Sequence, residues 1–293
     1  MLTTGIFTTY NFDIKVDKLN EPIYLIPFGD IHRSAPLCHE EKWLEFIRWA
    51  KTKKRAYFLG MGDYQDLTST SERRILSNKD LHDSTLQTFE KVYLEETKKL
   101  YNEIKFMNGR LIGLIEGNHY GEFQNQTTTT QKLAEFMGCK YLGVSSFIRL
   151  SFHYSTHHFH IDIWAHHGKG ASRLIGGSLN RVQQMGEAAE ADIYLMGHDH
   201  KKTVGLVTKL KLGEGTGGNK QEIKLHHKKQ LYARTGSFLK GYESDQVSYV
   251  ADMALSPTDL GVVKIELTPR RISKQENKKV ISDYFYCDIH ASI

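Results

Sequence analysis

The sequence predicts an α/β fold with a largely parallel or mixed sheet and helices packed against it. Short apolar runs bounded by polar turns recur along the 293 residues, and their length and flanks are those of buried strands. Segments with helical spacing of apolar residues lie between these runs. Strands that alternate with helices favour such a sheet, and we expect a single domain over residues 1–293.

The expected strands and helices follow from these two patterns. Each strand run ends at Gly, Asp, Asn or His, and the runs cover residues 24–28, 57–61, 111–115, 161–165 and 193–196. The segments of helical spacing cover residues 40–54, 84–107, 127–138 and 177–189. Both kinds of segment have the lengths typical of a compact α/β domain.

Two regions interrupt the alternation. Residues 64–83 are polar and charged, and we expect a loop or a small cap over a site. Residues 201–235 alternate apolar and basic side chains around the sequence GEGTGGN, which predicts a long, basic β-hairpin with a Gly-rich turn. Beyond residue 241 we expect further strands, with 261–268 the clearest.

Composition is typical of a globular enzyme, with 40% hydrophobic and 25% charged residues and a net charge of +5. No apolar run approaches the length of a membrane-spanning helix, and the first residues lack the features of a secretory signal. Cys38, Cys139 and Cys287 form no CxxC pair, so we expect free thiols and a cytoplasmic location. The sequence does not indicate an oligomeric state.

Potential metal ligands follow each of the five expected strands. Asp30 and His32 follow the first, and residues two apart on an extended backbone point to the same side. Asp63 follows the second strand, with Asp66 three residues later. The third is followed by Asn118.

The last two strands are followed by histidines. The fourth ends in His166 and His167, and the fifth in His198 and His200. A lone histidine at a strand end is more often structural than ligating. Five groups of oxygen and imidazole donors at strand ends indicate a shared site, because such ends meet at one edge of the sheet. We therefore expect one shared metal site.

The motifs D-x-H, G-D-x-x-D, G-N-H, H-H-G and G-H-x-H, in this order, resemble the motif set of the calcineurin-like metallophosphoesterases. They run from Asp30 to His200, about two thirds of the chain. The resemblance implies a four-layer α/β/β/α sandwich of two mixed β-sheets, with two divalent metal ions at the C-terminal ends of the strands. It also implies an enzyme that hydrolyses phosphate esters.

Carried over by motif, one metal ion would be held by Asp30, His32 and His200. The other would be held by Asn118, His198 and a histidine of the H-H-G turn, and Asp63 would bridge the two. His166 is the expected ligand of that turn because it comes first after the strand, although His167 remains an alternative. Carboxylate and imidazole ligands suit manganese, which we expect first, and also Fe, Zn, Ni or Mg.

The expected reaction is hydrolysis of a phosphodiester by a hydroxide that bridges the two metal ions. The resemblance makes His119 the proton donor to the leaving oxygen, although it could instead only orient a ligand. We expect Asp66 to support a ligand or a loop. Arg33 and Arg173 are weaker candidates for contact with the substrate phosphate.

The substrate class is open between two alternatives. The chain lacks the Arg of the Ser/Thr protein phosphatases and has Asp66 where purple acid phosphatases have a ligand Tyr. A small phosphate ester such as a nucleotide is favoured, and a DNA or RNA nuclease of the repair-exonuclease type is the alternative. The basic hairpin would suit nucleic acid, but lysines also protect sheet edges from aggregation. An inactive binding scaffold is a minor alternative, and no membrane partner is expected.

Overall fold

The computed structural model describes residues 7–77, 81–170, 172–214, 223–246, 248–257, 259–276 and 279–293. Its strands form two mixed sheets, as expected. The first follows the order β1-β6-β7-β8-β10-β11, with β9 paired to β10. Its strands are β1 (Thr8–Lys15), β6 (Ser145–Tyr154), β7 (His157–His166), β8 (Ile193–Met196), β9 (Lys202–Glu214), β10 (Ile223–Ser237) and β11 (Gly261–Val262).

The second sheet follows the order β13-β12-β2-β3-β4-β5. Its strands are β2 (Ile23–Phe28), β3 (Ala56–Gly60), β4 (Leu111–Leu114), β5 (Lys140–Tyr141), β12 (Lys264–Glu276) and β13 (Lys279–Ser292). Strands β2, β3 and β4 run parallel, as do β7, β8 and β10 of the first sheet. In each sheet, the carboxyl ends of these strands therefore lie at the same edge.

Helices cover the outer faces of both sheets. They are α1 (Glu40–Thr52), α3 (Asp83–Ile104), η1 (Lys105–Met107) and α4 (Thr129–Met137) on the second sheet, and α5 (Ile175–Ala188) on the first. Two short helices, α2 (Thr70–Ser77) and α6 (Tyr249–Asp252), lie in the connections between strands. One apolar core joins Trp43 of α1 and Leu100 of α3 to Phe28 of β2. Another joins Val182 of α5 to Tyr194 of β8.

A third apolar core lies between the two sheets. It joins Leu25 and Leu59 of the second sheet to Ile163 and Ile193 of the first, all nearly inaccessible to solvent. Burying each such side chain contributes about 1.5–3 kcal/mol. The order of layers is therefore helices, second sheet, first sheet, helix, which confirms the predicted α/β sandwich.

All five predicted strands and four predicted helices are present, with ends shifted by a few residues. The predicted hairpin is also present, because β9 pairs antiparallel with β10. Its expected turn lies partly outside the described residues. Residues 64–83 contain α2, and their role as a cap stays a prediction.

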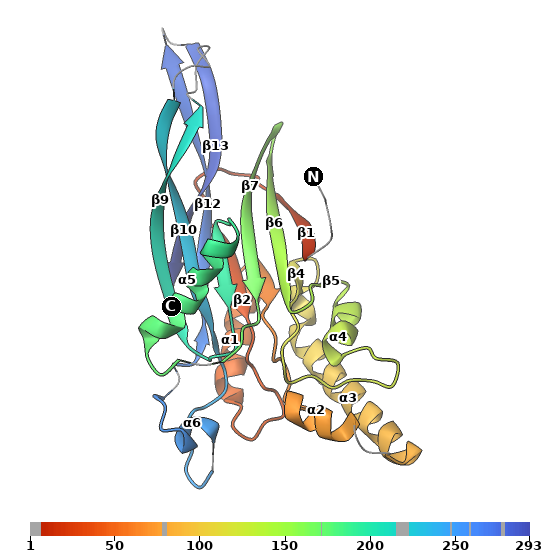
Figure 1. Ribbon diagram of the computed structural model, residues 1–293. Coiled ribbons are helices and arrows are strands. Elements are labelled where there is room, and N and C mark those ends of the chain that lie inside the picture. Colours follow the sequence, from red (N-terminus) through yellow and green to blue (C-terminus); the bar gives the residue numbers. More distant parts are fainter. Residues whose placement is uncertain are drawn as a thin grey trace.

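Two long hairpins extend together beyond the rest of the sheets (Figure 1). One is β9–β10, and the other is β12–β13 near the C-terminus. The sequence indicated the first hairpin. Of the second it indicated only strand structure at residues 261–268, where the structure has β11 and the start of β12. It did not indicate β1, which pairs parallel to β6. Among the described residues, no helix is both long and apolar enough to cross a membrane. All three cysteines are free and partly buried, as expected.

Candidate metal centre

The loops that follow five strands bring the expected ligands to one place. Those after β2, β3 and β4 belong to the second sheet and carry Asp30, His32, Asp63 and Asn118. Those after β7 and β8 belong to the first sheet and carry the remaining histidines. The expected ligands therefore lie where the carboxyl ends of strands from both sheets meet.

The first group of donor atoms comes from Asp30, His32 and His200. The Nε2 atoms of His32 and His200 lie 3.3 Å apart, and His200 Nε2 lies 3.7 Å from Asp30 Oδ1. One ligand atom from each residue lies within 4.8 Å of the others, so the three atoms are close enough together to bind the same metal ion. The sequence grouped the same three residues.

The second group comes from Asp63, His167 and His198. The Nε2 of His167 lies 3.2 Å from Asp63 Oδ2, and the Nδ1 of His198 lies 3.3 Å from that His167 nitrogen. The side-chain oxygen of Asn118 lies 3.0 Å from His167 Nε2 and 2.8 Å from His198 Nδ1. Four donor atoms therefore face one another.

Asp63 stands between the two groups. Its Oδ2 lies 3.8 Å from His32 Nε2 in the first group and 3.2 Å from His167 Nε2 in the second. Its Oδ1 accepts the backbone N–H groups of Asn118 and His119, at 2.6 and 2.9 Å. The carboxylate is thus fixed by one oxygen while the other faces both groups, which is the position that a bridging ligand needs.

The two histidines of the H-H-G turn take different positions from those preferred on sequence grounds. The ring of His167 is buried among the donor atoms, and its Nδ1 lies 2.8 Å from the carbonyl of Met61. His166 instead accepts the N–H of Gly168 at Nδ1 and lines a pocket beside α5. Because side chains alternate along β7, only one of the two rings can reach the centre, and it is that of His167.

The ligand loops also differ from the extended backbone expected for Asp30 and His32. Left-handed conformations occur at five donor residues, with φ values of 46° for Asp30, 50° for His32, 47° for Asp63, 73° for His198 and 60° for His200. Such conformations are unfavourable for residues other than glycine and collect at functional sites, where the surrounding structure enforces them. The side chains converge through these tight turns and not through the pleat of a strand.

Burial and neighbouring charges leave some of the donor side chains neutral and others charged. Burial lowers the pKa of His198 to about 4 and that of His200 well below its usual value. Burial is also the main cause that raises the pKa of Asp30 to about 7, against the opposing charge of His167. His198 and His200 are therefore neutral imidazoles at neutral pH, which is the form that binds metal.

His167 and Asp63 behave as an ion pair. Burial would lower the pKa of His167, but the carboxylates of Asp63 and Asp30 raise it to about 9. Burial would raise the pKa of Asp63, yet the charge and contact of His167 hold it well below its usual value. A metal ion bound between these groups would take the place of the His167 proton.

The donor set fits divalent cations. Asp30 Oδ1 and His32 Nδ1 are buried and have no hydrogen-bond partner among the described residues. Buried polar atoms are rarely left without a partner, and a carboxylate oxygen facing imidazole nitrogens is a typical ligand set for first-row metal ions. Both groups of side chains therefore have the composition of metal ligands, as does a third group that shares His32 and adds Asp66 and His119.

His119 lies beside this centre and is oriented by Asp66. The Nδ1 of His119 is 2.5 Å from Asp66 Oδ1, and the contact is the main cause that lowers the pKa of Asp66. Asp66 also lies 3.8 Å from His32 Nδ1. The sequence predicted a supporting role for Asp66 but not its partner, because the two residues are 53 positions apart.

Two arginines that the sequence did not single out as site residues hold the ligand loops. Arg73 of α2 donates from Nη1 to the carbonyls of Asn118 and Tyr120, at 3.1 and 3.0 Å, on either side of His119. Arg234 of β10 is fully buried, donates to the carbonyl of Gly197 at 2.8 Å, and pairs with Asp199. Only the fold brings these residues together, so no sequence pattern reveals them.

Other residues marked on sequence grounds lie apart from the centre. Arg33 pairs with Glu103 and Glu40, which accounts for its charge without a substrate. His153 and the neighbouring histidines belong to the β6–β7 hairpin. The Nε2 of His153 lies 2.6 Å from Asp13 Oδ1, so this histidine has a carboxylate partner of its own.

Comparisons with known proteins do not identify a family for this chain. No family model matches the chain, and no curated protein matches it. One solved structure, a conserved uncharacterised protein of Streptococcus pneumoniae described as a predicted phosphoesterase, aligns over 92% of this chain and 99% of its own. The identity is 10% and the TM-score 0.30, so this likeness carries no argument about the fold or the function.

Proposed function

We propose that the chain is a metal-dependent phosphoesterase that hydrolyses a phosphodiester at a centre of two divalent ions. The observation that carries the proposal is the position of Asp63, whose Oδ2 faces both donor groups. A carboxylate shared in this way holds two cations roughly 3.5–4 Å apart, the spacing used for in-line phosphoryl displacement. Manganese is the first choice, with Fe, Zn, Ni and Mg accepted by the same donors.

The ligand sets of the proposal follow the two groups. Asp30, His32 and His200 would hold one ion, and Asn118, His167 and His198 the other, with Asp63 between them. His167 replaces His166 in this assignment. Bound ions would supply the chemistry of the reaction, because they lower the pKa of water and neutralise phosphate charge.

The chain itself supplies the proton for the leaving oxygen. In the protonated form of His119, Nδ1–H donates to Asp66, and the carboxylate stabilises the imidazolium. The proton on Nε2 is then available to an oxygen that leaves the phosphorus. Positioned acids of this kind contribute about 10²–10⁴ in rate, so His119 is the proposed catalytic acid and Asp66 the residue that positions it.

A nuclease remains the second candidate, but the structure weakens its basis. Lys228 of the hairpin pairs with Glu190 and Asp192, and Lys229 pairs with Asp288. These pairs offset the positive charge of two lysines on the surface that would meet a polynucleotide backbone. A small phosphate ester is therefore favoured as the substrate.

The test compares variants of the manganese-loaded protein on two substrates, bis(4-nitrophenyl) phosphate and a single-stranded DNA. Asp63→Asn should lose nearly all activity and bind less than two ions per chain. His119→Asn should retain both ions and lose activity mainly in kcat. The loss should be smaller on the nitrophenyl ester, because its leaving group needs little protonation.

The matched control is His153→Asn, which removes an exposed imidazole–carboxylate contact far from the centre. It should retain full activity. A preference for DNA, with binding that weakens steeply as salt rises, would favour the nuclease. Equal, negligible turnover by the wild type and Asp63→Asn under several metals would overturn the enzyme and return the chain to an inactive scaffold.

A further inference from the structure

A pocket lies beside the metal centre, between α5 and the carboxyl ends of β7 and β8. Its volume is about 680 Å³, within the range of small-molecule sites. Met196 and Gly168 line it, and a Cβ added at Gly168 would lie only 2.9 Å from the carbonyl of Gly197 and 3.2 Å from the Cβ of His198. The pocket and the donor groups are therefore separated by a single loop.

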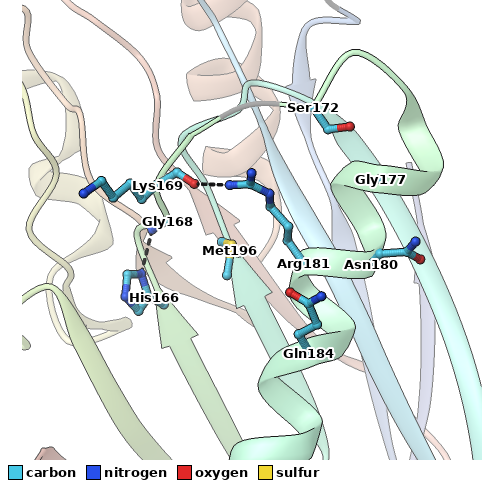
Figure 2. A pocket seen from close by; sticks show the side chains of 9 residues that line it. All are labelled: His166, Gly168, Lys169, Ser172, Gly177, Asn180, Arg181, Gln184 and Met196. Carbon is cyan, nitrogen blue, oxygen red and sulfur yellow. Dashed lines mark hydrogen bonds between the residues drawn. The ribbon is translucent and has the colours of Figure 1, made fainter.

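The polar lining of the pocket consists of hydrogen-bond donors and positive charge. Figure 2 shows Arg181 and Gln184 on α5, with Arg181 reaching toward Lys169, and His166 on the other side of Met196. His166 accepts the N–H of Gly168 at Nδ1, so its neutral ring carries its proton on Nε2 as a donor.

Two cations border the same space. Arg181 donates from Nη1 to the carbonyl of Lys169 at 2.7 Å, which holds its guanidinium beside another residue that lines the pocket. Lys169 is exposed and also lines the pocket. Among the described residues, neither cation has an acidic partner, and no lining residue is acidic. A guanidinium held in this way retains further N–H groups for an anion.

We propose that this pocket binds a second phosphate group of the substrate, and that Arg181, Gln184 and His166 are its recognition residues. That this phosphate belongs to the substrate rests on the proposed phosphoesterase function, whereas phosphate binding in the pocket does not. Arginine suits phosphate because its planar donors match two phosphate oxygens. The substrates would then be esters that carry a further phosphate close to the scissile one.

The binding test needs no turnover. Inorganic pyrophosphate is titrated calorimetrically into protein stripped of metal by a chelator, for the wild type and three variants. Arg181→Gln and Gln184→Leu should each weaken binding, the first by about tenfold or more, as expected for a lost charge-assisted hydrogen bond. Gln184→Leu leaves the Arg181–Lys169 contact in place, so it guards against a loss caused by a displaced loop.

Arg48→Gln is the matched control, since it removes the same charge from an exposed position on α1. It should leave pyrophosphate binding unchanged. No binding to the wild type, or binding that Arg181→Gln does not weaken, overturns the proposal. A loss of equal size in Arg48→Gln would mean that only net charge matters, and it also overturns the proposal.

A kinetic test links the pocket to the substrate. The 4-nitrophenyl ester of thymidine 5′-phosphate is compared with the same ester carrying a 3′-phosphate. Arg181→Gln should raise KM about tenfold for the second compound only, with kcat little changed. If neither ester is hydrolysed while pyrophosphate binding still depends on Arg181, the proposed function fails and the phosphate site stands. If both esters respond equally, the second-phosphate assignment fails.

Discussion

A methyl group added at Gly117 should disrupt the metal centre, because there is no room for it. A Cβ at this position would lie 2.1 Å from Asp63 Oδ1 and 2.2 Å from the Asp63 backbone nitrogen. Real Cβ contacts stay above 3.0 Å, so the backbones of Gly117 and Asp63 would have to move apart by about 0.8 Å and the Asp63 side chain would have to move as well. Asn118 and His119, which donate to that same oxygen, immediately follow.

The magnitude follows from two contributions. Overpacking in a tightly packed region costs about 1–3 kcal/mol. Weakening one hydrogen bond to a buried carboxylate costs about 1.5–3 kcal/mol more. We therefore expect Gly117→Ala to lower the free energy of unfolding by about 4 kcal/mol, and Tm by roughly 8 °C at about 2 °C per kcal/mol for a chain of this size.

Thermal unfolding of chelator-treated protein, followed by circular dichroism, measures the stability. Metal analysis after dialysis against manganese measures the site, and Gly117→Ala should bind less than one ion per chain. The control is Gly176→Ala in the first turn of α5, where an added Cβ meets nothing within 4 Å. The control should leave stability unchanged or raise it by up to about 1 kcal/mol. Gly117→Ala with the Tm and metal content of the wild type would refute the steric reasoning.

Three further substitutions test the interactions around the site and on the surface. Arg73→Met removes the hydrogen-bond donors to the loop that carries His119, so steady-state kinetics should show kcat about tenfold lower while metal analysis shows unchanged metal content. An unchanged kcat contradicts the positioning role of Arg73. Arg234→Met leaves the buried charge of Asp199 without its partner and should cost about 3–5 kcal/mol in urea unfolding; a cost below about 1 kcal/mol contradicts it. Arg149→Met removes an exposed pair with Asp162, although that carboxylate is partly buried, and should cost only about 0.5 kcal/mol at neutral pH. Burial would raise the pKa of Asp162, but the contact with Arg149 lowers it on balance. The pair therefore stabilises the fold above the unfolded pKa of 3.8, and the stability difference between wild type and Arg149→Met disappears as pH falls through the lowered pKa. A stability difference that persists in strong acid contradicts this assignment.

Local patterns were sufficient to predict the strands that precede the ligands and the main helices between them. The run at 193–196 ends in Gly-His-Asp-His, and the structure has β8 over the same residues, followed by two donor histidines. A buried strand and the turn after it are both determined by neighbouring residues, so the sequence contains the information. The same holds for α4, whose capping box joins Thr128 and Gln131.

The details of the centre depend on contacts that the sequence does not encode locally. His166 and His167 are equivalent in a motif, and the choice between them depends on which face of β7 meets the second sheet. The left-handed backbone at Asp30 contradicts the extended geometry assumed for D-x-H. It is maintained by partners far along the chain, since Ser237 and Phe238 both donate to the Asp30 carbonyl.

The contribution of both sheets to a single set of donors has a consequence for how the protein opens. Asp30, His32 and Asp63 follow strands of one sheet, and His167 and His198 follow strands of the other. Bound ions would therefore cross-link the two sheets. Pulling the sheets apart and releasing the ions would then be one event. Exchange of metal should be as slow as this opening, and amide hydrogens on β2 and β8 should gain protection together when the ions bind.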